Sequence, residues 1–134
     1  MNPRVLIVDD EADFGALVAR WLSPRYRAVA LTDGRGLARE LEEEPASLLV
    51  LDVRLPGEDG FELCRRVRTD ERFADVPVLF LTGSREEDLY LRNLKAGGTG
   101  YLAKQVGRTQ LLAAVDALVP GDHAEAEPDN GTGD

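Results

Sequence analysis

Short apolar runs alternate with longer amphipathic stretches along most of the chain. Consecutive apolar residues, as in 48–51, are typical of strands buried on both faces of a parallel sheet. Between such runs, apolar residues recur at intervals of three and four, as in 14–22, which predicts helices. The expected strands cover residues 4–8, 26–31, 47–52, 76–81 and 101–103, and the expected helices lie around residues 14–22, 35–44, 61–68, 85–96 and 108–119.

Five strands alternating with five helices predict a doubly wound α/β fold with a parallel sheet. Four of the five strands end in a charged or reactive group: Asp9 and Asp10, Asp52, Thr82, and Lys104. The carboxyl ends of parallel strands meet at one edge of the sheet, where ligands bind in open α/β folds. We therefore expect these side chains to converge, although up to 95 positions separate them in the sequence.

The chain divides by charge at Pro120. The net charge of the 134 residues is −9, and residues 120–134 contain five acids and no lysine or arginine. This leaves 20 acids against 16 bases in residues 1–119, a net charge of −4. We expect residues 1–119 to form one domain, and the Gly-, Pro- and acid-rich residues 120–134 to be a disordered tail or a linker.

Composition excludes several classes of protein. No basic patch or DNA-binding motif is present, so direct nucleic-acid binding is not expected. No stretch approaches the 18 apolar residues of a membrane span, and residues 1–4 lack the apolar region of a signal peptide. The one cysteine, Cys64, lies at core spacing on an expected helix and is interpreted as a packing residue. These features predict a cytoplasmic protein.

The strand-end carboxylates need a cation. Two carboxylates about 4 Å apart repel by roughly 4 kcal/mol at an effective dielectric of 20. Mg²⁺ relieves such repulsion with oxygen ligands and leaves positions for water or phosphate oxygens. The Lys104 ammonium and the Thr82 hydroxyl can contact a phosphoryl group. The loop after the first strand is acidic, so a phosphoryl group can enter only with a metal that screens it.

One carboxylate is then a candidate acceptor. An acid can attack phosphorus and form an aspartyl phosphate. Asp52 is the best candidate because its strand is central, with Asp9 and Asp10 on one side and Thr82 and Lys104 on the other. The protein would mainly supply position and charge neutralisation.

These residues resemble the receiver domain of two-component response regulators, over residues 4–119. The matching segments are Val8-Asp9-Asp10, Leu51-Asp52, Leu55-Pro56-Gly57 with Asp59-Gly60, Leu81-Thr82-Gly83, and Tyr101-Leu102-Ala103-Lys104. The resemblance implies the flavodoxin-like strand order 2-1-3-4-5 that the chemotaxis member of this family has.

The resemblance implies a role for each site residue. Asp52 would be the phosphoacceptor, supplied by a histidine kinase or phosphotransfer protein. Thr82 and Lys104 would bind phosphoryl oxygens, and Thr82 with Tyr101 would switch the surface formed by residues 85–118. Magnesium would be held by Asp9, Asp10, Asp52 and the backbone carbonyl of Arg54.

The residue after the lysine departs from the family pattern. Receivers usually have proline there, often after a cis peptide bond, whereas this chain has Gln105. A cis bond before a residue other than proline costs about 3–4 kcal/mol. Either the bond between Lys104 and Gln105 is trans and the following loop takes another course, or it is cis and strained.

Three functions are compared. The leading hypothesis is a phosphorylatable signalling domain, not an enzyme, that acts on a downstream protein or effector domain, with dimerisation on phosphorylation as an option. The alternative is a phosphorylation-independent interaction module with the same fold. A magnesium phosphatase is disfavoured because such enzymes need an acid two residues after the nucleophile, where this chain has Arg54.

Overall fold

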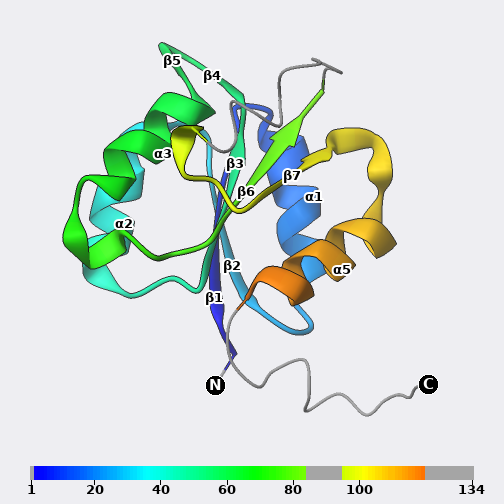
Figure 1. Cartoon of the computed structure of the whole chain (residues 1–134). Helices are drawn as coiled ribbons and strands as arrows, with labels where there is room; N and C mark the ends of the chain where they lie inside the picture. The colour runs from blue at the N-terminus through cyan, green and yellow to red at the C-terminus, as the bar shows by residue number, and fades with distance from the viewer. Residues whose placement is uncertain (1, 84–94, 120–134) are drawn as a thin grey trace.

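A computed structural model describes residues 2–83 and 95–119, and its centre is a five-stranded parallel sheet (Figure 1). The order β2-β1-β3-β6-β7 confirms the expected flavodoxin-like order, because β4 and β5 belong to a separate hairpin. The strands are β1 (Arg4–Val8), β2 (Arg27–Leu31), β3 (Leu48–Asp52), β6 (Val78–Thr82) and β7 (Gly100–Ala103).

Helices cover both faces of this sheet, as Figure 1 shows, with α2 and α3 on one side and α1 and α5 on the other. The α-helices are α1 (Ala12–Leu22), α2 (Leu37–Glu43), α3 (Gly60–Arg68) and α5 (Arg108–Leu118). Of the helix expected at 85–96, residues 85–94 lie outside the described part of the chain. Short 3-10 turns are η1 (Gly34–Gly36), η2 (Glu71–Phe73) and η3 (Lys104–Val106).

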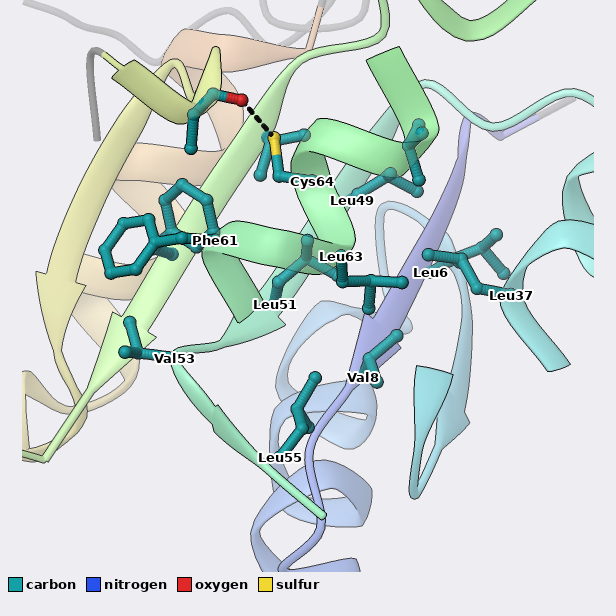
Figure 2. Close-up of a cluster of buried hydrophobic side chains, with 14 of the residues drawn as sticks. Leu6, Val8, Leu37, Leu49, Leu51, Val53, Leu55, Phe61, Leu63 and Cys64 are labelled. Carbon is teal, nitrogen blue, oxygen red and sulfur yellow. Dashed lines mark hydrogen bonds between the residues drawn. The ribbon is translucent and has the colours of Figure 1, made fainter. Parts of the chain in front are cut away.

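Alternation along the strands divides the core into two layers. Leu49 and Leu51 of β3 point toward α2 and α3, and they share a core cluster with Phe61 of α3 (Figure 2). Leu48 and Val50 of the same strand belong to the layer under α1 and α5. Because β3 is buried on both faces, its apolar run shows no period of two.

Cys64 packs in the first of these layers. Its side chain is fully buried, and its thiol donates a hydrogen bond of 3.1 Å to the Ala96 carbonyl (Figure 2). This confirms the interpretation of Cys64 as a packing residue. Burial also raises the pKa of the thiol above its usual value, which disfavours the nucleophilic thiolate.

A small hairpin follows β3 that the apolar pattern did not predict. Strands β4 (Arg54–Leu55) and β5 (Glu58–Asp59) pair in antiparallel fashion, with Gly57 at φ 78° in the turn between them. Asp59 then begins α3 through a capping box with Glu62. The hairpin therefore leads directly from the strand-end Asp52 to the first turn of α3.

Element boundaries differ from the expected ones by a few residues. The fourth strand of the sheet begins at Val78 and includes Thr82, where the sequence predicted 76–81. Residues 35–36 belong to η1 and not to the helix expected at 35–44. The tail expected at 120–134 lies outside the described residues. Within the described residues, no helix is long and apolar enough to cross a membrane.

Candidate functional site

Strand register gathers the strand-end residues at one edge of the sheet. Val8 of β1 pairs with Leu51 of β3, so Asp9 and Asp52 are the next residues along two neighbouring strands. Asp52 pairs with Leu81 of β6, which precedes Thr82. Thr82 in turn pairs with the last residue of β7, immediately before Lys104. The convergence expected from the sequence is thus a consequence of parallel pairing.

Three carboxylates form a compact cluster at this edge. Oxygen atoms of Asp9, Asp10 and Asp52 lie within 4.8 Å of one another. Asp9 and Asp52 are buried, with exposed fractions of 1% and 4%, whereas Asp10 is exposed. Asp10 and Asp52 line a cleft of about 440 Å³ together with Glu11, Arg54, Gly83 and Lys104.

Lys104 contacts two of these carboxylates, Asp9 and Asp52, and also the carboxylate of Glu11. Its Nζ lies 3.1 Å from Asp52 Oδ2, 3.0 Å from Asp9 Oδ2 and 2.7 Å from Glu11 Oε1. Burial alone would lower the pKa of the Lys104 ammonium, but its hydrogen bonds to these carboxylates raise the pKa above its usual value. Lys104 therefore carries a full positive charge at neutral pH.

Asp52 has a perturbed acidity. The pKa of its carboxyl is raised from 3.8 to about 6. Burial is the largest cause and the charge of Asp9 adds to it, whereas the Arg54 N–H and Lys104 both lower the pKa. The Arg54 N–H donates to Asp52 Oδ1 over 3.1 Å. Asp52 is thus a carboxylate whose negative charge is only partly compensated by the surrounding protein.

Gly60 allows the hairpin to approach the backbone of Asp52. The Gly60 N–H donates a hydrogen bond of 2.6 Å to the Val53 carbonyl. A Cβ atom at Gly60 would lie 2.2 Å from the Asp52 carbonyl oxygen, a distance that no side chain could occupy without a backbone shift. Glycine at position 60 is therefore required by the close contact with the candidate acceptor.

The donor set of the cluster fits a magnesium ion. Asp9 Oδ2 is buried and accepts no hydrogen bond from the described residues, although it lies 3.0 Å from Lys104 Nζ. Hard divalent cations take such carboxylate oxygens as ligands. A divalent ion would also reduce the excess of negative charge that Lys104 alone leaves. Arg54 lines the same cleft, as the predicted carbonyl ligand requires.

The two predicted switch residues stand on neighbouring strands. Thr82 is 4% exposed at the end of β6, and Tyr101 of β7 is 39% exposed. Tyr101 pairs with Phe80, two residues before Thr82. The described residues contain no cis peptide bond, so the bond between Lys104 and Gln105 is trans. Both residues belong to the 3-10 turn η3.

Sequence reasoning did not assign Glu11 and Phe14 to the site. Glu11 makes the shortest of the contacts to Lys104, and the Lys104 ammonium lies 5.1 Å from the centre of the Phe14 ring. The position of Glu11 directly after two strand-end acids was an available signal. Phe14 carried no such signal, because its spacing within 14–22 is that of a core residue.

Comparison with known sequences identifies relatives along the same stretch. The sequence profile of the response regulator receiver domain matches residues 5–116. The transcriptional regulatory protein GltR of Pseudomonas aeruginosa is 38% identical over 116 residues, which cover 86% of this chain and 48% of GltR. RpaA of Synechocystis, a DNA-binding transcriptional regulator, is 38% identical over 119 residues, which cover 87% of this chain and 49% of RpaA.

Comparison with solved structures gives the same relationship. The chemotaxis protein CheY4 of Vibrio cholerae superposes with a TM-score of 0.83 at 25% identity, covering 88% of this chain and 99% of CheY4. The chain thus spans nearly the whole of this neighbour. It spans about half the length of the curated relatives GltR and RpaA.

Proposed function

The chain belongs to the receiver domain family of response regulators, and on that premise we propose that it is a magnesium-dependent phosphoacceptor whose acceptor is Asp52. Receivers of this family are signalling domains of two-component systems rather than conventional enzymes. The observation that carries the proposal is the placement of one buried carboxylate, Asp52, between two further acids and a lysine.

The proposed reaction takes a phosphoryl group from a phosphohistidine of a histidine kinase or phosphotransfer protein. A bond forms between Asp52 and phosphorus as the phosphorus–nitrogen bond breaks, and the electron pair returns to the imidazole, which takes a proton from solvent. Asp9, Asp10, Asp52 and the Arg54 carbonyl would hold Mg²⁺, which supplies charge neutralisation when it is bound.

Two residues of the chain would contact the transferred group. Lys104 is already 3.1 Å from Asp52 Oδ2 and would donate to a phosphoryl oxygen. The Thr82 hydroxyl would donate to another oxygen and, by doing so, couple phosphorylation to Tyr101 on the neighbouring strand. The surface around residues 85–118, of which 85–94 lie outside the described part, would then change its affinity for a partner.

The output is proposed from the relatives. GltR is a transcriptional regulatory protein and RpaA is a DNA-binding regulator, each about twice the length of the matched region. We propose that the receiver acts on an effector domain or on a separate protein partner, with dimerisation as one route, and that it does not itself contact nucleic acid.

The test uses beryllofluoride, which mimics a phosphoryl group bound to a carboxylate, and acetyl phosphate as a small donor. With magnesium present, the chain should bind beryllofluoride and gain one phosphoryl group, as measured by calorimetry and intact mass. Asp52→Asn should do neither. Asp13→Asn, which removes an exposed acid from the first turn of α1, is the matched control and should behave like the parent.

Other outcomes would redirect the proposal. Equal labelling of Asp52→Asn and the parent would mean that another residue is the acceptor. No response to magnesium or beryllofluoride in the parent would favour a phosphorylation-independent interaction module. Repeated turnover of phosphate monoesters would favour a phosphatase, which the Arg54 position argues against.

A further inference from the structure

Glu11 carries two separate contacts at the site. Its backbone N–H donates to Asp9 Oδ1 over 2.9 Å, and its carboxylate accepts from Lys104 over 2.7 Å. Glu11 is the N-cap residue of α1, but its side chain makes no capping hydrogen bond. The Glu11 carboxylate is therefore directed at Lys104 and not at the helix end.

The three carboxylate partners of Lys104 differ in how easily they could leave. The Asp9 and Asp52 side chains are 1% and 5% exposed, so they cannot move away from Lys104 into water. The Glu11 side chain is 65% exposed and would return to water when the contact breaks. Loss of a hydrogen bond to a buried acceptor costs more free energy than loss of one to an exposed acceptor, because water can replace the lost donor at the exposed acceptor.

A lysine ammonium has three donors, and here all three have carboxylate acceptors. A phosphoryl oxygen on Asp52 needs one of these donors. We infer that Glu11 is an exchangeable counter-ion of Lys104: it holds the ammonium in the unphosphorylated protein, and a phosphoryl group on Asp52 must displace it. Glu11 is thus a positioning residue that opposes binding of the phosphoryl group.

This inference rests on the proposed function, and its test is a beryllofluoride titration at saturating magnesium. Glu11→Gln keeps the length of the side chain but removes its charge. Because exposed ion pairs contribute about 0.2–1 kcal/mol, we expect the apparent Kd for beryllofluoride to fall by roughly 1.5- to 5-fold. Asp13→Asn removes a charge from the same turn without contacting Lys104 and should leave the Kd unchanged.

A second measurement reports the contact without metal or beryllofluoride. In the free protein, the ¹³Cε resonance of Lys104 should shift in Glu11→Gln and stay in place in Asp13→Asn. In the parent, beryllofluoride should move this resonance in the same direction as Glu11→Gln does, because both release Lys104 from Glu11.

The outcomes separate the two proposals. If the parent does not bind beryllofluoride, the proposed function fails. If the parent binds it but Glu11→Gln binds no tighter, or Asp13→Asn gains as much, the function stands and the role of Glu11 is wrong. An unchanged Lys104 resonance in Glu11→Gln would likewise overturn the inference.

Discussion

Two clusters of charged side chains lie at opposite edges of the same sheet, and they differ in the ratio of cations to carboxylates. At the amino end of β1, Arg4 is 6% exposed and pairs with Glu40 and Glu44, and Arg27 adds a further ion pair to Glu44. At the carboxyl edge, Lys104 stands among four acids, which are Asp9, Asp10, Glu11 and Asp52.

The Arg4 cluster is complete in itself. Its two cations balance two carboxylates, and Arg4 also donates to the carbonyls of Glu40 and Glu44 over 3.1 and 2.7 Å. Glu40 lies in the last turn of α2, where its carbonyl also accepts the Glu44 N–H, and Glu44 is the residue that caps the helix. Arg4 therefore joins β1 to the end of α2. Such a site holds the fold together and has no capacity for a further ion.

The Lys104 cluster is incomplete. Its acids outnumber the lysine that contacts them, a buried oxygen of Asp9 accepts no hydrogen bond from the described residues, and burial raises the pKa of Asp52 to about 6. A cluster with unbalanced charge is costly for the fold and is useful only if a ligand completes it. The comparison teaches that charge balance, more than the presence of charge, distinguishes a structural cluster from a binding site.

The largest expected effect comes from breaking the complete cluster. Arg4→Met removes the hydrogen bonds that the guanidinium donates to the Glu40 carboxylate and to the carbonyls of Glu40 and Glu44. A hydrogen bond to a charged group contributes about 1.5–3 kcal/mol, and several are lost here. We expect a loss of about 3 kcal/mol in urea unfolding with unchanged magnesium affinity. Arg20→Met, at an exposed position of α1, should lose little. A loss below about 1 kcal/mol would contradict the structural role of Arg4.

The second effect comes from completing the other cluster. A ligand at 100 times its Kd stabilises a protein by about 2.7 kcal/mol. Magnesium at such a concentration should therefore raise the unfolding free energy by about that amount, as followed by urea unfolding monitored by circular dichroism. Asp10→Asn should remove most of this gain and Asp13→Asn should keep it. Equal gains in both variants would place the metal elsewhere.

The smallest effect is a gain in stability without metal. Because the folded state raises the pKa of Asp52 above its ordinary 3.8, the folded protein binds the proton more tightly than the unfolded chain. The resulting stability is fully present below about pH 3.8 and is lost as the pH rises through about 6. Asp52→Asn removes the cost of the buried charge and should stabilise the metal-free protein on the order of 1 kcal/mol at neutral pH.

The same variant has a pH signature. The gain should shrink as the pH falls through about 6 and be absent near the ordinary carboxyl pKa of 3.8, where Asp52 is protonated in the folded state. Thermal melts of Asp52→Asn and the parent across this range measure it. A gain that is independent of pH would mean that burial of the Asp52 charge is not its cause.

Much of the fold and most of the site were predictable, for one reason. Apolar runs such as 48–51 mark buried parallel strands, and parallel pairing brings their polar ends together. The observed strand order confirmed the predicted parallel sheet, whereas the roles of Asp52, Thr82 and Tyr101 stay predictions. The hairpin of β4 and β5 was not predictable, because two-residue strands leave no periodic signal.

The sequence by itself determined which residues reach the functional edge, since strand ends are set by the local pattern of apolar and polar residues. Only the tertiary structure decided how their charges are shared. Arg4 begins β1 and Lys104 directly follows β7. The charge of the Arg4 cluster is balanced, whereas Lys104 is surrounded by an excess of acids. That difference depends on α2 and on the start of α1, which pack beside the strands and contribute Glu40 and Glu11 from distant positions in the chain.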